Sequence, residues 1–222
     1  AKTNLNIRID GIFRNRDGGL VAYNIVTKNN IRDRFKSPPR PAIWTDASDK
    51  DWNSWIWQQQ KRIKSMDQLE KVIQVTQEER DAFAQSHEMF NMGITPYYAS
   101  LIDSDNPNCP SRLQSVAKKG VLNFSPHDME DPLAEERDMP VPGITHRYPD
   151  RVLFYTTHNC PVYCRHCTRK RKVADPSSAT QTKQLEDSLA YIESHKEIRD
   201  VVISGGDPLS NSDDRLEYIL SR

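Results

Sequence analysis

Apolar residues in the last third of the chain gather in two short runs, and a helical pattern follows each run. Residues 151–157 and 200–204 are apolar, β-branched or aromatic, so we expect two buried strands there. Apolar residues recur at helical spacing over 182–195 and over 213–220. This order of strand, loop and helix is typical of parallel α/β units, whose active groups lie on the loops after the strands.

Helical spacing dominates residues 42–103. The apolar run 52–56 has i, i+3, i+4 spacing and predicts one helix, capped by Asp49 or Asp51. The large aromatic residues of this region are expected to form a helix-on-helix core rather than a ligand-binding box.

Capping chemistry marks two further helix starts in this region. Thr76 and Glu79 stand three residues apart, which is the spacing of a capping box. Pro96 suits the first turn of a helix, where its missing N–H costs nothing. We therefore expect one helix to begin after Thr76 and another near Pro96.

Two segments lack sustained periodicity. Residues 1–41 are basic, and we expect a mobile, solvated arm rather than one that binds RNA or lipid. Residues 104–150 are rich in Pro, Asn and Asp and are expected to form a connecting segment. The predicted organisation is thus an arm over 1–41, a helical region over 42–103, the connecting segment, and α/β units over 151–222.

Composition narrows the class of protein. The 222 residues include 31 basic and 31 acidic side chains, so no bulk charge attracts nucleic acid or an anionic membrane. No stretch approaches the ~20 apolar residues that span a bilayer, and the first residues lack the apolar core of a signal peptide, so we expect a cytoplasmic protein. The chain starts with Ala and ends directly after a helical pattern, which leads us to expect a fragment.

Three of the four cysteines lie within eight residues, directly after the first predicted strand. Cys160, Cys164 and Cys167 can place three thiolates on one iron–sulfur cube. Four thiolates would saturate a [4Fe–4S] cluster, so three leave one iron open. An open iron can chelate the amino and carboxylate groups of S-adenosylmethionine, whose reductive cleavage releases a 5′-deoxyadenosyl radical. We take Cys109, which is distant in sequence, as a bystander.

Zinc is the main alternative for this loop, with His158 or His166 as a fourth ligand. A structural zinc site has four ligands, usually from two knuckles of paired cysteines, and the sequence has no second knuckle. A two-cluster ferredoxin pattern would need a fourth nearby cysteine followed by Pro. A non-enzymatic zinc or iron–sulfur module is therefore the less favoured interpretation.

Ser204-Gly205-Gly206-Asp207 follows the second predicted strand. Paired glycines let a backbone come close to a ligand, and an oxygen acceptor there can hold the ammonium of a bound methionine moiety. An ordinary strand-to-helix turn would use the same glycines for their dihedral angles. The glycine turn follows the second strand as the cysteine loop follows the first, so the two are expected to lie side by side. We therefore favour the cofactor-binding interpretation of the glycine turn.

Two basic patches flank the first predicted strand. One runs from His146 to Arg151, and the other runs from Arg169 to Lys172. Arginine is the natural bidentate partner of phosphate and carboxylate, so the patches can hold an anionic cofactor and substrate. A solvated basic face would be the default for such runs. Binding of nucleic acid is also open as an interpretation, although the aromatics that would stack on bases are sparse here.

Three motifs together resemble a known family. They are the runs from Asp138 to Leu153, from Cys160 to Arg171 and from Arg199 to Asp207. They look like those of the radical-SAM, pyridoxal-phosphate-dependent amino-acid 2,3-aminomutases. The earlier runs 51–58 and 94–103 resemble the helical region of that family, so the likeness extends from about Trp44 to Arg222.

The resemblance implies a fold, a reaction and a set of cofactors. The fold would be α/β, with an N-terminal helical region followed by the first βα units of a partial (β/α)6 radical-SAM, TIM-like barrel. The reaction would move the α-amino group of a small amino-acid substrate to its β-carbon with a [4Fe–4S] cluster, S-adenosylmethionine and pyridoxal 5′-phosphate. A flavodoxin- or ferredoxin-type electron donor and a homo-oligomer of the full-length protein are also implied.

Carried over position by position, the resemblance gives roles to the residues named above. The cluster ligands of the family match Cys160, Cys164 and Cys167. Its S-adenosylmethionine contacts match Gly205, Gly206 and Asp207. Residues near the pyridoxal phosphate match Arg147, Tyr148 and Arg151. The arginine that holds the substrate α-carboxylate matches Arg169.

Other residues of the family's site have no match in this chain. The Schiff-base lysine and the residues that read the substrate side chain fall in a later segment, so we expect the 222 residues alone to be inactive. The run 170–175 differs from the lysine enzymes, and glutamate is therefore favoured over lysine as substrate. The alternative is a related radical-SAM enzyme that modifies a lysine of a translation factor, although such relatives are usually shorter at the N-terminus.

Overall fold

The computed structural model describes residues 12–14, 20–22, 38–86, 91–123, 125–173, 175, 177 and 179–222. The chain divides into two units, Ala1–Pro39 and Arg40–Arg222. In the first unit, β1 (Ile12–Arg14) and β2 (Leu20–Ala22) pair antiparallel. The predicted arm thus contains a hairpin that the sequence pattern missed, and most of its other residues lie outside the described ones.

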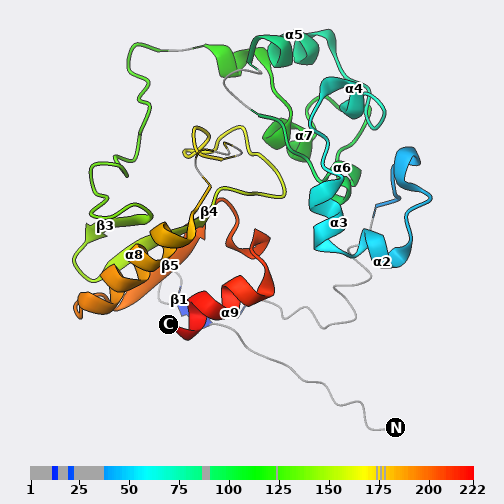
Figure 1. Ribbon diagram of the computed structural model, residues 1–222. Coiled ribbons are helices and arrows are strands. Elements are labelled where there is room, and N and C mark those ends of the chain that lie inside the picture. The colour runs from blue at the N-terminus through cyan, green and yellow to red at the C-terminus, as the bar shows by residue number, and fades with distance from the viewer. Residues whose placement is uncertain are drawn as a thin grey trace. The chain divides into compact units, whose positions relative to one another are not determined.

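Short helices dominate residues 42–122 of the second unit (Figure 1). They are the 3₁₀ turn η1 (Ala42–Trp44), α2 (Asp49–Trp52), α3 (Trp55–Gln60), α4 (Met66–Leu69), α5 (Gln77–Ser86), α6 (Pro96–Ser100), α7 (Pro110–Ser115) and the 3₁₀ turn η2 (Lys119–Leu122). Their apolar side chains form one core, in which Ile63, Leu69 and Ile94 are fully buried. Two of these elements, α7 and η2, fall in the segment that the sequence predicted as a connector.

The first predicted helix is interrupted, and its predicted cap is wrong. α2 ends at Trp52, and the hydroxyl of Ser54 caps a new helix, α3. Ser48 caps α2 in place of Asp49 or Asp51, by accepting the backbone N–H of Asp51 at 3.1 Å. Serine and aspartate are about equally good caps, so local chemistry does not decide between neighbouring candidates.

The predicted capping box is confirmed. The hydroxyl of Thr76 accepts the backbone N–H of Glu79 at 3.3 Å, and the Glu79 carboxylate accepts the backbone N–H of Thr76 at 2.8 Å. Arg112 of α7 donates to the same carboxylate at 2.8 and 2.7 Å, and both side chains are buried. The ion pair therefore ties α7 to the start of α5.

The sheet of the second unit has the strand order β3-β4-β5. β4 (Arg151–Thr157) and β5 (Asp200–Gly205) pair in parallel, as predicted. β3 (Ile144–Tyr148) pairs antiparallel with β4, so the end of the predicted connecting segment belongs to the sheet. Three strands form an open sheet, and the described residues do not close a barrel.

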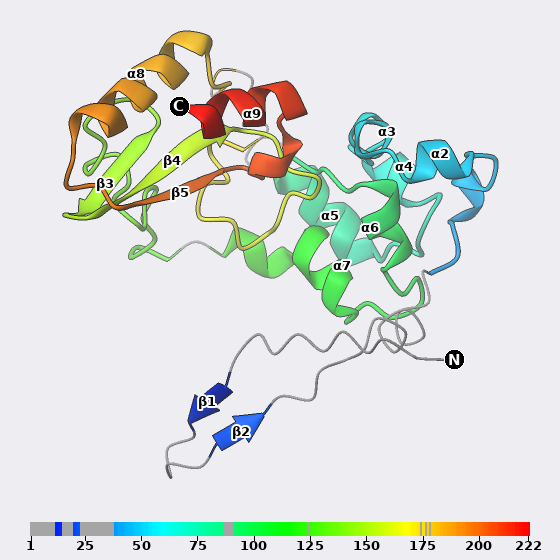
Figure 2. The ribbon, with the colours of Figure 1, turned by 90° about the horizontal axis from the view of Figure 1, so that it is seen from below.

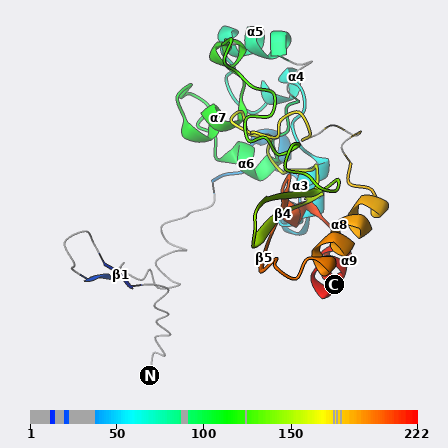
Figure 3. The ribbon, with the colours of Figure 1, turned by 90° about the vertical axis from the view of Figure 1, so that its left-hand side faces the viewer.

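Two helices, α8 (Thr182–Ser194) and α9 (Asp213–Ser221), cover one face of this sheet (Figures 2 and 3). Their side chains, including Leu185 and Ile219, pack with Phe154 in a second core. Side chains alternate between the faces of a strand, so Tyr155 and its register partner Ser204 lie on the opposite face. The α/β class is thus confirmed. Among the described helices, none is long and apolar enough to cross a membrane.

Candidate functional site

Two loops leave the carboxyl ends of β4 and β5 next to each other. The cysteine loop, residues 158–173, follows β4, and the glycine turn, residues 204–207, ends β5. Parallel pairing places Thr157 opposite Gly205. The three cysteines of the first loop are half-buried. Two motifs that are separate in the sequence therefore meet at one edge of the sheet.

The glycine turn is fastened to the cysteine loop by backbone hydrogen bonds. The N–H of Gly206 donates to the carbonyl of Thr157 at 2.6 Å, and the N–H of Asp207 donates to that of Asn159 at 2.7 Å. Gly205 has φ +127°, and a Cβ on Gly206 would lie 2.1 Å from the Asn159 oxygen. Position 206 thus requires glycine because the backbone of Asn159 passes too close for a Cβ. The interpretation of this turn as a ligand-binding turn did not include that packing role.

The helical region holds the cysteine loop from another side. The N–H of Tyr163 donates to the carbonyl of Gly93 at 2.8 Å, and a Cβ on Gly93 would lie 2.8 Å from the Tyr163 ring. Arg62 Nη1 donates to the Cys160 carbonyl at 2.6 Å and to the Tyr163 hydroxyl at 2.9 Å. The helical region therefore holds the first half of the cysteine loop at two places, Cys160 and Tyr163.

Burial and nearby negative charge raise the pKa of two thiols of this loop, Cys160 and Cys164. Burial, followed by negative charge at Cys167, Asp207 and Cys164, raises the pKa of Cys160 to about 12. Burial and Cys167 also raise the pKa of Cys164. Thiolates are the metal-binding form, so a metal must displace these protons when it binds.

The three thiols of the described structure are not gathered around one metal ion. In the part of the chain that the structure describes, no three His, Cys, Asp or Glu side chains form a group that could hold one metal ion. A zinc site with His158 or His166 would need such a group. In a [4Fe–4S] cluster each thiolate binds a different iron, so the sulfurs need not surround one centre. Cys109, the remaining thiol, is buried in the helical core.

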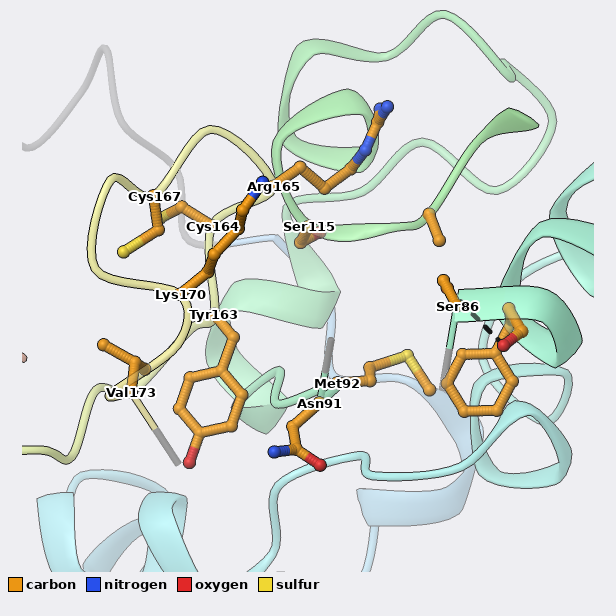
Figure 4. A pocket seen from close by; sticks show the side chains of 12 residues that line it. Ser86, Asn91, Met92, Ser115, Tyr163, Cys164, Arg165, Cys167, Lys170 and Val173 are labelled. Atoms are coloured by element: carbon orange, nitrogen blue, oxygen red, sulfur yellow. Dashed lines mark hydrogen bonds between the residues drawn. The ribbon is translucent and has the colours of Figure 1, made fainter. Parts of the chain in front are cut away.

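A small cavity of about 50 Å³ borders the cysteine loop (Figure 4). Tyr163, Cys164 and Cys167 line it from the loop, and Met92 and Ser115 line it from the helical region. Two of the three cysteines therefore have open space beside them rather than a packed core.

Arg169, just after the last cysteine of the loop, is surrounded by acceptors. Its Nε and Nη2 atoms donate to the Glu135 carboxylate at 2.9 and 2.5 Å. Its Nη1 atom donates to the Ser204 hydroxyl at 3.2 Å and to the Gly205 carbonyl at 3.3 Å. The hydrogen bond to Glu135 raises the pKa of Arg169. The guanidinium therefore connects the cysteine loop, the glycine turn and the predicted connecting segment.

Tyr155 of β4 brings an unused hydroxyl close to this arginine. The hydroxyl is buried and has no hydrogen-bond partner among the described residues. Burial raises the pKa of Tyr155 to about 12, although the positive charge of Arg169 lowers it in part. A buried hydroxyl without a partner is uncommon and leaves a donor available for a ligand.

The other residues predicted to hold an anion line a second hollow, of about 200 Å³, beside the sheet. Arg147, Tyr148 and Arg151 share its wall with Glu135. Arg147 Nε donates to the Asp138 carboxylate at 2.7 Å. Glu135 therefore belongs both to this hollow and to the surroundings of Arg169.

Comparison with known proteins identifies homologues of this chain. A model described as a 4Fe–4S single cluster domain matches residues 147–221. The L-lysine 2,3-aminomutase of Bacillus subtilis (strain 168) is 48% identical over 178 residues, which are 80% of this chain and 38% of that protein. The L-lysine 2,3-aminomutase of Acetoanaerobium sticklandii is 47% identical over 193 residues, or 87% and 45% of the two chains. The chain is a homologue of the amino-acid 2,3-aminomutases.

A glutamate enzyme of the aminomutase family is also similar. The glutamate 2,3-aminomutase of Clostridioides difficile (strain 630) is 38% identical over 177 residues, which are 80% of this chain and 42% of that protein. The chain thus spans less than half the length of these aminomutases.

The structure brings the predicted aminomutase site residues into three neighbouring places. The cysteine loop meets the glycine turn, Arg169 touches that turn, and the other two arginines line one hollow with Tyr148. The binding roles given to these residues stay predictions.

Three residues near these places were missed by sequence reasoning. Glu135 lies in a segment that was interpreted as a connector, and nothing local pairs it with Arg169. Arg62 has no local signal for its contact with the cysteine loop. Tyr155 was counted only as part of an apolar strand, although its hydroxyl and the alternation of faces were a usable signal.

Proposed function

We propose that this protein is an amino-acid 2,3-aminomutase, a radical-SAM isomerase that moves an α-amino group to the β-carbon. The observation that carries the proposal is the three-cysteine loop at the end of β4, fastened to the glycine turn at the end of β5. The 48% identity to a lysine 2,3-aminomutase supports it.

In this proposal, Cys160, Cys164 and Cys167 hold a [4Fe–4S] cluster and leave one iron free for S-adenosylmethionine. Gly205, Gly206 and Asp207 contact the methionine end of that cofactor, since their turn lies directly against the cysteine loop. When bound, the cluster and S-adenosylmethionine supply a carbon radical that can take a hydrogen from the substrate.

In this proposal, the predicted basic residues bind two different anionic groups, the phosphate of the cofactor and the carboxylate of the substrate. Arg147, Tyr148 and Arg151 bind the phosphate of pyridoxal 5′-phosphate, because they line one hollow and arginine suits phosphate. Arg169 orients the α-carboxylate of the substrate. The lysine that carries pyridoxal phosphate belongs, in this proposal, to the part of the family that the chain does not span.

Two substrates are candidates, and different observations favour them. Higher identity to lysine 2,3-aminomutases than to a glutamate 2,3-aminomutase, 48% against 38%, favours lysine. The run 170–175 after Arg169 is the feature that favours glutamate. We give lysine precedence, because identity over 178 residues samples far more positions than one short run.

The proposal extends to the rest of the protein and its surroundings. β4 and β5 would be the first strands of a barrel of the (β/α)6 kind, with later strands joining at β5. A low-potential flavodoxin or ferredoxin would supply the electron, because cleaving a sulfonium needs a strong reductant. A homo-oligomer in the cytoplasm completes this proposal.

The test is anaerobic reconstitution of the full-length protein with iron, sulfide, pyridoxal phosphate, S-adenosylmethionine and a reductant. The assay offers L-lysine and L-glutamate separately, and we expect β-lysine or β-glutamate as product. Cys164→Ala is expected to lose both iron and activity, whereas Cys109→Ala keeps both. A protein that takes up the cluster but forms neither product is no aminomutase on these substrates. A protein that holds only zinc has no radical chemistry.

A further inference from the structure

Every edge of the Arg169 guanidinium is already in use. Arginine presents five N–H donors in a fixed fork, and a carboxylate binds best across two parallel donors. The Nε and Nη2 edge holds Glu135, with contacts at 2.9 and 2.5 Å. Nη1 faces two acceptors of the glycine turn, at 3.2 and 3.3 Å. A second carboxylate therefore finds no free two-donor edge.

Glu135 presents to Arg169 the same chemical group as an amino-acid substrate would. Its side chain is 13% exposed and that of Arg169 is 16% exposed, so the pair is largely withdrawn from water. Glu135 also lines the hollow that carries Arg147 and Tyr148. The carboxylate thus lies between the residues proposed to hold the substrate and those proposed to hold the phosphate.

The backbone beside Glu135 is in a disfavoured conformation. Ala134 has φ +50°, the only positive φ of a non-glycine residue among the described residues. Such a conformation persists where contacts on either side hold it. Asp131 supplies part of that hold, since it accepts the N–H of Ala134 on its carbonyl at 3.0 Å and the N–H of Glu136 on its carboxylate at 2.9 Å. Release of Glu135 from Arg169 would let this turn relax.

We propose that Glu135 is an internal competitor for Arg169, which the α-carboxylate of the substrate must displace. The inference rests on the proposed function, because it takes Arg169 as the substrate-carboxylate residue. Exchange of one carboxylate for another leaves Arg169 paired with a negative charge. Substrate affinity therefore depends on how much more strongly Arg169 binds the substrate carboxylate than it binds Glu135. Glu135 would then set substrate affinity without touching the reacting atoms.

The test measures equilibrium binding of L-lysine and of L-glutamate to the full-length protein, loaded with pyridoxal phosphate but without S-adenosylmethionine, so that no turnover occurs. Glu135→Gln keeps the shape and removes the charge. A neutral amide accepts hydrogen bonds from a guanidinium about half as strongly as a carboxylate does, so the substrate displaces it more easily. We therefore expect the substrate dissociation constant to fall roughly tenfold. Glu136→Gln is the matched control. Glu136 pairs with Arg171 and Lys172 at 3.4 and 3.5 Å, and neutralising it should leave substrate affinity unchanged.

A second variant shifts the equilibrium in the opposite direction. Ala134→Gly accepts φ +50° without a Cβ penalty, so it stabilises the docked turn. We expect substrate binding to weaken by about five- to thirtyfold, which corresponds to the penalty that a Cβ incurs in this region. Opposite changes in the two variants would support the exchange.

Two results would overturn the inference. In the first, the wild-type protein forms the β-amino acid, but Glu135→Gln binds the substrate no more tightly than the wild type does. Glu135 would then either have no effect on binding or support Arg169 in its place. The other is a wild-type protein that neither binds nor converts either amino acid, which would remove the proposed function as well. The product assay thus distinguishes the two failures.

Discussion

At the scale of single residues, the cysteine loop depends on positions that admit no side chain. Gly206 is one of them, because the backbone of Asn159 crosses directly over its α-carbon. A flexible side chain could move aside, but a backbone carbonyl that is itself part of the loop cannot do so without shifting the cysteine beside it.

Gly206→Ala is therefore expected to disturb both folding and metal loading. Its Cβ would lie 2.1 Å from the Asn159 oxygen, and overpacking of this kind costs about 1–3 kcal/mol of unfolding free energy. Thermal unfolding and iron content after anaerobic reconstitution measure the two effects. Gly120→Ala is the control, because no atom of the described residues, its two chain neighbours aside, lies within 4 Å of a Cβ at that position. Equal iron content in both variants would contradict the prediction.

A buried ion pair stabilises the helical region. Glu79 and Arg112 have side chains that are 0% and 1% exposed, and their nearest atoms are 2.7 Å apart. Removing one partner of such a pair leaves an uncompensated buried charge, which costs about 3–5 kcal/mol. We therefore expect Glu79→Gln to lower the free energy of unfolding of the second unit by about 3–5 kcal/mol at pH 7. Asp187→Asn, which breaks an exposed pair with Lys183, should cost about 0–0.5 kcal/mol.

The same pair predicts how stability changes with pH. Burial raises the pKa of Glu79, but hydrogen bonds from Arg112 and Thr76 lower it by a larger amount. The pKa of Glu79 therefore lies below the ordinary 4.5. A depressed pKa in the folded state stabilises the fold above about pH 4.5, and this contribution is lost as pH falls through the folded pKa. Urea unfolding at several pH values should therefore show the difference between wild type and Glu79→Gln shrinking below pH 4.5. A constant difference would argue against the linkage.

At the scale of elements, the cysteine loop is shared between the sheet and the helices. β4 and β5 hold it through the glycine turn, and the segment between α3 and α4 reaches it through Arg62. That side chain also lies over the Tyr163 ring, with 5.2 Å from its central carbon to the ring centroid. Neither the sheet nor the helices alone would orient the loop.

Arg62→Ala is expected to loosen the bound cluster without preventing its formation. The variant loses the hydrogen bonds to Cys160 and Tyr163, and a hydrogen bond from a charged donor is worth about 1.5–3 kcal/mol. Iron release to a chelator, followed by absorbance, should be faster than in the wild type. Arg80→Ala is the control in the same region, since Arg80 pairs at the surface with Glu70. Identical release rates for both variants would show that Arg62 does not support the cluster.

At the scale of the whole molecule, the described residues of the second unit form two apolar cores. One lies among the helices and the other between the sheet and the pair α8 and α9. Polar contacts link the two parts, for example from Gln59 to Ser210 at 3.1 Å. The cysteine loop lies where these two parts meet.

Removal of residues 1–39 is expected to leave the second unit folded. Contacts divide the chain at Pro39, and Arg40 forms its hydrogen bonds with Ala47 and Asp49 inside the second unit. The thermal midpoint and the iron content of the shortened protein should both equal those of the intact one. A lower midpoint would mean that the first unit contributes to the stability of the second.

Local chemistry was enough to predict much of this protein from its sequence. The strands at 151–157 and 200–204, the capping box at Thr76 and the cysteine loop all depend on residues a few positions apart. Even so, Trp55 and Ile56 are 44% and 52% exposed, so helical spacing alone did not identify the buried face.

Only the tertiary structure decided which distant groups meet. Glu135 pairs with Arg169 across 34 positions, and Arg62 reaches Cys160 across 98. The strand β3 likewise required a partner, because an edge strand is defined by pairing and not by its own pattern. Periodicity and capping record interactions within one element, whereas the surroundings of the proposed site arise where separate elements pack, and no short stretch of sequence contains that information.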